Sequence, residues 1–323
     1  MPKCMDKYKE KFALEFAKVM QVNAEKWNES KRTRIKNLYT KWILIYIGGF
    51  FGGFIPAKRE GANYDLNFHI ILSIIGFIGA IFVAIFFECD GLKEEIKKDL
   101  YTKLLKAFGH DIVYDCGEIS YSDYNNSMLF NKPVRYASVD DKFCGVFNNS
   151  PFIITESNLN YLKTSHGRTQ ETRLFKGVSM YFKMQKKIKS RVLIYSKDLL
   201  NINVPKGYEK VEFEYEKFNK KYDVYVQRAK DETRGQIEAR YLFNTAFMDR
   251  FMQLQTSFKV GKMKCSIYDD TMLVLLPTNR DLFEINPLFK KIDDINNYQT
   301  LFDEFASVLS FLEVLNLSSK TGL

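Results

Sequence analysis

The pattern of hydrophobic and polar residues changes along the chain, and each part predicts a different kind of element. Residues 3–38 place aromatic and aliphatic side chains at helical spacing among Lys and Glu, which predicts an amphipathic helix. Residues 42–57 and 66–87 carry no formal charge. From residue 110 onward, short segments alternate hydrophobic and polar side chains, which is typical of strands with one buried face.

The two uncharged stretches are predicted to be transmembrane helices. The second is long enough to cross a bilayer and shows no polar face at any helical period. The first is shorter and is interrupted by Pro56, but Tyr39 and Trp42 at its edge suit a membrane interface. Glycines in both stretches would let the two helices approach closely. The alternative is a buried helical hairpin inside a soluble domain.

Basic residues around these stretches predict an orientation. Between the stretches, Lys58 and Arg59 are balanced by Glu60 and Asp65. The flanks are strongly basic, so both ends of the chain are expected to face the cytoplasm. Charged residues throughout positions 1–20 argue against a signal peptide. We therefore expect a multi-pass protein of the cytoplasmic (inner) cell membrane. The flanking basic residues are Lys31, Arg32, Arg34, Lys36 and Lys41 before the first stretch, and Lys93, Lys97, Lys98, Lys103 and Lys106 after the second.

The predicted fold class is α+β, with an N-terminal helix, two transmembrane helices and then a largely antiparallel β domain with a few helices. Strands do not alternate with helices, which argues against a doubly wound fold. Four parts are expected. They are a cytoplasmic N-terminal helix at 1–41, a transmembrane hairpin at 42–87, a juxtamembrane helix at 88–109 and a cytoplasmic α+β domain at 110–323.

Within the last part, helices are predicted at about 244–255, capped by Asn244 or Thr245, and at 298–316. Between the predicted strands lie turn signals, among them Asn148-Asn149 and Asp269-Asp270. The predicted strand segments include VRYASV, KFCGVF, PFIITES, KGVSMYFKM, SRVLIYS, KVEFEYE, YDVYV and KCSIYDDTMLVLL.

The net charge of +9 matters mainly through its placement. Residues 1–106 hold 18 Lys/Arg and 12 Asp/Glu, a net of +6, whereas residues 107–323 hold 30 and 27, a net of +3. An excess around the uncharged stretches favours a membrane surface as partner, with anionic lipid contact. A nucleic-acid binder would concentrate the excess in its folded domain, so no nucleic acid is expected.

The five cysteines are scattered, without a CxxC motif or any other short spacing. We interpret them as free, buried thiols in a reducing compartment. The three histidines are not near a cysteine in sequence, so neither zinc nor another metal is expected.

Several stretches, taken together and in order, resemble the DUF3137 family, bacterial membrane proteins of unknown function. The resemblance rests on NNSMLF, DDKFCGVF, LFKGVSMYFKMQKKIKSRVLIYS, FEYEKFNKKYDVYV, IEARYLFNTAFMDRFMQL and DLFE, preceded by the two uncharged stretches. The family usually reads FKGLFF with an asparagine-lysine pair after it, whereas this chain reads FKGVSMYF followed by MQ. The resemblance implies the architecture and a cytoplasmic domain, and it brings no catalytic residues.

No catalytic residue is predicted. Cys116 and Cys144 qualify as nucleophiles by residue type alone, because no pattern marks a base beside them. Phosphate-binding GxxxxGK[ST] and GxGxxG motifs are absent from the sequence, and no cofactor is expected.

Two groups of residues are candidate sites. The segment KMQKKIKSR, residues 183–191, concentrates five basic residues in a predicted hairpin turn that could contact a membrane surface. In IEARYLF, Glu238 and Arg240 would share one face of a strand, as a polar site or as ion pairs with Arg250 or Asp249 of the following helix. The five basic residues are Lys183, Lys186, Lys187, Lys189 and Arg191.

Three functions remain open. The favoured one is a membrane-anchored cytoplasmic interaction or scaffold domain with an unknown protein partner, which could form homo-oligomers through its Gly-rich spans. The alternative is a membrane-associated hydrolase or transferase with an unrecognised site. A small transporter or channel subunit is the third, and it would have to oligomerise.

Overall fold

The computed structural model describes residues 3–59, 66–109, 112–165, 167–199, 202–228, 234–285 and 290–320. The chain divides into two compact units. The first comprises Met1–Glu15, Tyr101–Glu284 and Gln299–Leu323, and the second comprises Phe16–Leu100 and Ile285–Tyr298.

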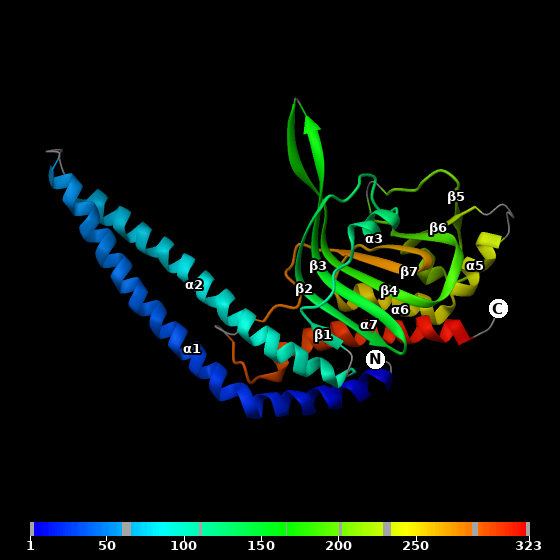
Figure 1. Cartoon of the computed structure of the whole chain (residues 1–323), viewed down its shortest axis with the longest axis horizontal. Coiled ribbons are helices and arrows are strands. Elements are labelled where there is room, and N and C mark those ends of the chain that lie inside the picture. Colours follow the sequence, from blue (N-terminus) through cyan, green and yellow to red (C-terminus); the bar gives the residue numbers. More distant parts are fainter. Residues whose placement is uncertain are drawn as a thin grey trace. The chain divides into compact units, whose positions relative to one another are not determined.

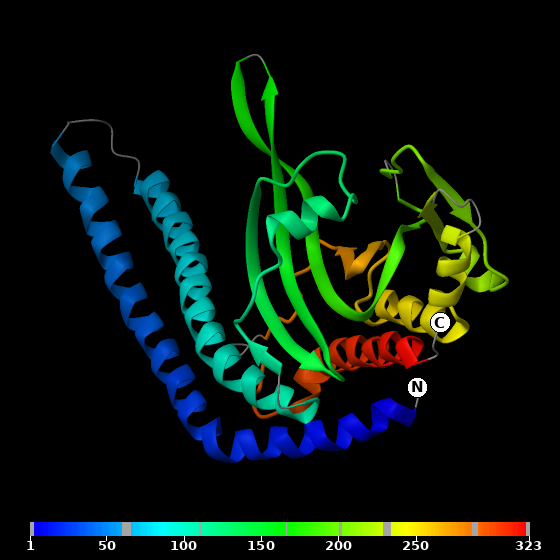
Figure 2. The ribbon, with the colours of Figure 1, turned by 45° about the vertical axis from the view of Figure 1, so that its right-hand side comes forward.

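The second unit is built on a helical hairpin. Helices α1 (Lys3–Arg59) and α2 (Leu66–Leu104) run alongside each other in opposite directions (Figures 1 and 2). Ser30 donates a hydrogen bond to Glu95 across the hairpin (3.2 Å), and the Arg34 guanidinium lies 3.4 Å from the same carboxylate. Trp27 is fully buried. The short 3-10 helix η2 (Ile295–Tyr298) completes this unit.

The prediction of two transmembrane helices is wrong. Within the described residues, no helix combines the length and the apolar character that crossing a membrane requires. Each uncharged stretch is one portion of a much longer helix, whose remainder is rich in charged residues. The predicted location, a multi-pass protein of the inner membrane with both termini in the cytoplasm, is wrong for the same reason. The predicted loop residues 60–65 lie outside the described residues.

The first unit is built on an antiparallel sheet, as the alternating pattern predicts. Its strands follow the order β1-β2-β3-β4-β6-β5, and β7 pairs with β4 as well. Every pair is antiparallel. The strands are β1 (Ile112–Tyr114), β2 (Tyr136–Phe147), β3 (Ser150–Ser165), β4 (Arg168–Ser196), β5 (Tyr208–Val211), β6 (Tyr222–Gln227) and β7 (Lys264–Pro277).

Three predicted interruptions do not break the strands. Segment VRYASV from Tyr136 onward and the segment KFCGVF are both part of β2. Likewise, KGVSMYFKM and SRVLIYS are both part of β4, and Asp269-Asp270 lies inside β7. The cause is irregular pairing, because the register shifts in β2 after Val139 and in β4 after Lys183. A bulge inserts a residue and disturbs the period-2 pattern while the strand continues. The turn at Asn148-Asn149 is confirmed, with φ of 48° and 64°.

Helices cover the two faces of this sheet differently. Helices α6 (Thr245–Ser257) and α7 (Gln299–Lys320) pack on one face, where Phe311 contacts Phe182 of β4. Helix α3 (Tyr121–Asn126) lies over the other face (Figure 2), where Tyr124 joins a buried cluster with Phe175. The helices predicted at about 244–255 and at 298–316 are confirmed as α6 and α7. Asn244 caps α6 by accepting from the Phe247 N–H (2.8 Å).

The predicted strand around Glu238 and Arg240 is wrong, because residues 237–242 belong to helix α5 (Arg234–Leu242). Its Gln, Glu, Ala, Arg and Leu residues have good helix propensity. The remaining short elements are α4 (Glu216–Asn219) and the 3-10 helix η1 (Leu105–Ala107).

The start of α1 belongs to the core of the first unit. The Phe12 ring lies 5.1 Å from that of Phe302 and 6.1 Å from that of Phe108, and Tyr8 lies 5.6 Å from Phe108. Residues far apart in sequence therefore build one aromatic cluster with α7.

Candidate functional site

The basic run at 183–191 lies where β4 exchanges one neighbouring strand for another. Along one edge, β4 pairs with β3 up to Phe182 and with β6 from Val192 onward. Its other edge pairs with β7 on both sides of this interval. The predicted hairpin turn is therefore wrong, since these residues are the middle of one continuous strand.

The five basic residues separate into two groups. Lys183 forms an ion pair with Asp270 (2.5 Å), and that hydrogen bond raises the pKa of Lys183 and lowers the pKa of Asp270. Arg191 stacks over the Tyr268 ring (4.8 Å) and donates to the Asn126 carbonyl. These two residues tie β4 to its surroundings. The others, Lys186, Lys187 and Lys189, are exposed.

Glu238 connects the two candidate sites. From α5 its Oε2 accepts hydrogen bonds from the backbone N–H groups of Lys189 (3.2 Å) and Ser190 (3.0 Å). It therefore satisfies two donors of β4 in the interval between β3 and β6. Arg240 is exposed on the same helix, and residues two apart on a helix point in roughly opposite directions. Arg250 donates to Gln253 of its own helix (2.9 Å).

Sequence reasoning missed two buried glutamates in the first unit. Glu156 of β3 is 7% exposed, and Glu304 of α7 is 1% exposed. The Leu282 N–H donates to Glu156 Oε2 (3.1 Å). Among the described residues, Glu304 Oε2 has no hydrogen-bond partner. The sequence did hold a signal, because Glu304 precedes Val308 by four residues and so belongs to the apolar face of the predicted helix.

Burial governs the electrostatics of this pair. It raises the pKa of Glu304 to about 8, against the lowering effect of Arg280 and Lys259, while Asp303 and Glu156 raise it further. Burial also raises the pKa of Glu156 to about 7; the Leu282 N–H opposes this, and Asp281, Asp141 and Asp140 add to it. These carboxyl groups can therefore hold protons near neutral pH. Because both groups are buried, their protonation state affects the stability of the fold.

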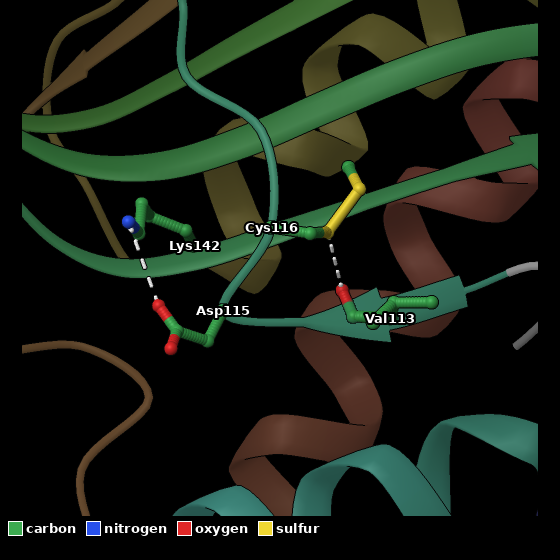
Figure 3. The surroundings of a disulfide bond; sticks show 5 residues. Val113, Asp115, Cys116 and Lys142 are labelled. Carbon is green, nitrogen blue, oxygen red and sulfur yellow. Dashed lines mark hydrogen bonds and ion pairs between the residues drawn. A yellow bond between two sulfur atoms is a disulfide. The ribbon is translucent and has the colours of Figure 1, made fainter.

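A disulfide joins Cys116 to Cys144, so the expectation of free thiols is wrong for this pair (Figure 3). Cys144 lies opposite Val113 in the β1–β2 ladder. The backbone then turns back at Asp115 and Gly117, both with positive φ, and brings Cys116 over β2. Because the two cysteines are 28 residues apart, their spacing in the sequence does not indicate a disulfide. Beside the disulfide, Lys142 pairs with Asp115 (3.5 Å; Figure 3).

Within the residues that the structure describes, no group of three or more His, Cys, Asp or Glu side chains could hold a metal ion. Cys265 is a free, buried cysteine, and its burial raises the thiol pKa well above the ordinary value.

The helices of the second unit expose apolar faces. On α2 the exposed isoleucines recur at three- and four-residue spacing, which places them on one helical face. Ile47 and Ile78 are equally far in sequence from Ser30 and Glu95, so the antiparallel helices place them level with each other. We call these residues the apolar hairpin surface: Ile43, Leu44 and Ile47 on α1, and Ile71, Ile74, Ile75 and Ile78 on α2, each 46–65% exposed.

No curated protein matches the chain. Among solved structures, the chain is similar to the crystal structure of the mycobacterial trehalose monomycolate transport factor A, TtfA. The identity is 9%, the match covers 56% of this chain and 75% of that chain, and the TM-score is 0.33. A similarity this weak carries no argument. The resemblance inferred from the sequence is confirmed by a family model: residues 173–317 match DUF3137, described as "Protein of unknown function".

Proposed function

We propose that the chain is an interaction or scaffold protein that associates with a second copy of itself through the apolar hairpin surface. The observation that carries this proposal is the exposure of seven large aliphatic side chains on α1 and α2. Single exposed hydrophobic residues are common, but contiguous apolar patches mark interaction sites.

The chemistry of this surface suits an identical partner. Its residues are uncharged, so two copies do not repel each other electrostatically when they meet. On α2, Gly76 and Gly79 have open space where a Cβ would lie. Glycines on a helix surface allow a second helix to come close. A two-fold arrangement would bury the same patch on both copies.

The buried carboxyl pair does not favour the hydrolase or transferase alternative. Glu304 lies on the buried side of α7 and is 1% exposed, so a substrate would not reach it. We therefore base the proposal on the surface of the hairpin.

Sedimentation velocity of the full chain at increasing concentration tests this proposal. We expect a shift from monomer toward dimer, and we expect the triple variant Leu44→Gln, Ile75→Gln, Ile78→Gln to remain monomeric at concentrations at least tenfold higher. Glutamine has good helix propensity, so these exposed substitutions should preserve the helices. Val22→Gln is the matched control, because Val22 is 76% exposed on the same helix α1 but lies outside the surface.

A wild-type chain that stays monomeric, or a triple variant that dimerises like the wild type, would contradict the proposal. Co-sedimentation with lipid vesicles gives the second arm. A monomeric chain whose vesicle binding is lost in the triple variant would assign the surface to lipid and likewise overturn self-association.

A further inference from the structure

The disulfide between Cys116 and Cys144 fastens a short loop segment to the sheet (Figure 3). Cys144 is fixed in β2, where it is paired with Val113 of β1 and with Ile153 of β3. Cys116 lies outside the helices and strands, in the loop that follows β1. We call residues 116–118 the strap. Because one sulfur belongs to the sheet and the other to the strap, this bond controls how firmly the strap is held.

Other contacts anchor the two ends of the strap. Before it, the Asp115 N–H donates to the Lys142 carbonyl (2.7 Å), and after it, Ile119 is buried. Within the strap, Glu118 forms an ion pair with the Lys142 side chain (3.3 Å). The Glu118 side chain is 63% exposed, and exposed ion pairs contribute little. Opening the disulfide would therefore free the strap between two fixed points, from which it can return and close again.

The strap packs directly on an isoleucine at the margin of the core. A Cβ added to Gly117 would lie 3.3 Å from the Cβ of Cys144 and 3.6 Å from Cδ1 of Ile153. Ile153 in turn packs against the buried cluster that includes Phe175. Release of the strap would therefore uncover the Ile153 side chain while the strands beneath it stay paired.

The two bonded cysteines are accessible to a reagent. Cys116 and Cys144 are each partly exposed, whereas Cys265 is fully buried and the pKa of its thiol is raised well above the ordinary value by that burial. Exchange between thiols and disulfides requires a thiolate to reach a sulfur atom. Among the cysteines whose side chains the structure describes, the bonded pair is therefore the one that a reductant can reach.

We propose that the Cys116–Cys144 disulfide is a reversible redox switch, which a dithiol reductant opens while the sheet stays folded, releasing the strap from Ile153. A thiolate of the reductant attacks the Cys116 sulfur, the S–S bond breaks, and Cys144 leaves as a thiolate and takes up a proton. The second thiol of the reductant then attacks the mixed disulfide and releases Cys116 as a thiol. The protein gains two electrons and two protons, and the dithiol is oxidised to a disulfide.

The switch is separate in residues from the apolar hairpin surface, so either proposal can fail alone. Its chemistry is tested by alkylation of the full chain in native buffer, followed by mass spectrometry of its peptides. We expect dithiothreitol to make Cys116 and Cys144 reactive, Cys265 to stay protected, and oxidised dithiothreitol to restore the bond. A disulfide that opens only in urea, or together with exposure of Cys265, would be a structural crosslink and would overturn the switch.

Movement of the strap is tested by NMR of the full chain labelled at the isoleucine δ1 methyl groups. A soluble paramagnetic agent reports the exposure of each methyl group. We expect dithiothreitol to raise the relaxation enhancement at Ile153 at least twofold and to leave Ile154, which is fully buried on the same strand, unchanged. No change at Ile153 would show that the strap stays closed, and equal increases at both would show that the sheet opens. Either result would contradict the proposal.

The double variant Cys116→Ser, Cys144→Ser represents the open state without a reductant. We expect its Ile153 methyl group to behave as in the reduced wild type and not to respond to dithiothreitol. This second measurement is also the control, because a response in the double variant would place the effect of the reductant elsewhere in the chain. A double variant that unfolds, or whose Ile153 matches the oxidised wild type, would rule out a switch that works in the folded protein.

Discussion

Glu304 makes the stability of the first unit depend on pH. Its pKa is raised from an ordinary 4.5 to about 8 in the folded chain, so between these values the folded state holds a proton that the unfolded state has released. The resulting stabilisation is full below about pH 4.5 and is lost as pH rises through about 8. Glu156, with its pKa raised to about 7, likewise contributes stability that is lost as the pH rises.

Glu304→Gln should remove most of this dependence. Glutamine resembles the protonated acid and does not ionise, so we expect the variant to be more stable than the wild type at pH 8.5 by about 2–4 kcal/mol. At pH 5 the two should differ much less. Urea unfolding at both values measures this. Glu216→Gln on α4 is the control, because the Glu216 side chain is 80% exposed; a Glu304→Gln variant with the wild-type pH slope would refute the assignment.

Single residues also show where sequence reasoning succeeded. The sequence predicted Asn244 or Thr245 as the helix cap, and Asn244 accepts from the Phe247 N–H, because a short polar side chain before a helical pattern has one strongly favoured role. Glu238 was placed on a strand and lies on a helix. Its contact with the backbone of Lys189 and Ser190 depends on tertiary structure, which no local pattern encodes.

At the level of elements, the start of α1 should contribute strongly to the stability of the first unit. Phe12 is 3% exposed and contacts the rings of Phe108 and Phe302. Phe12→Ala removes a buried aromatic side chain, so we expect a loss of about 3–5 kcal/mol in the free energy of unfolding. Equilibrium urea unfolding followed by near-ultraviolet circular dichroism measures it.

Leu14→Ala is the control for this substitution. Leu14 lies two residues further along the same helix and is 57% exposed, so its truncation should change stability by about 0.5 kcal/mol or less. Similar losses in both variants would indicate that helix propensity matters here and that the aromatic cluster does not.

Long elements were predictable and their interruptions were not. Helices α6 and α7 follow from hydrophobic spacing over many residues, and the sheet follows from alternation. The unity of β4 does not, because the polar run at 183–191 looks like a turn when read locally. Its continuity depends on β7, which pairs with β4 on both sides of that run. Pairing between distant segments leaves no trace in local composition.

On the scale of the whole molecule, the two units should differ in local stability. Strands β4 and β7 pair at the centre of the sheet, and Met180 and Val274 there are fully buried. In the second unit, by contrast, α1 and α2 expose aliphatic side chains to solvent. Local opening is easier where fewer buried contacts must be broken.

Hydrogen exchange measured by mass spectrometry should reveal this difference. At a concentration where the chain is monomeric, we expect amides at 178–182 and 272–276 to exchange slowest. Amides at 34–47 in α1 should exchange distinctly faster. Equal protection of both regions would mean that the chain unfolds as one cooperative unit.

The sequence pattern predicts neither the division into these two units nor the absence of a membrane-spanning helix among the described residues. The stretches at 42–57 and 66–87 are uncharged and apolar, and the prediction of membrane helices was based on that apolar character. The pattern does not record that each run continues a long, charged helix. Nor does it show that residues 1–15 join the same compact unit as α7.

The position of β7 in the chain has a consequence for synthesis on the ribosome. Strands β3 and β4 form a local hairpin and can pair as soon as both have emerged, whereas β7 is translated much later. Until then one edge of β4 is unpaired along Val178, Met180 and Phe182, which are buried in the finished sheet. The nascent chain therefore carries an apolar open edge while the residues between β4 and β7 are being synthesised, a state that chaperones recognise and that promotes aggregation. Among the strands described, the last one made is the one that closes this edge.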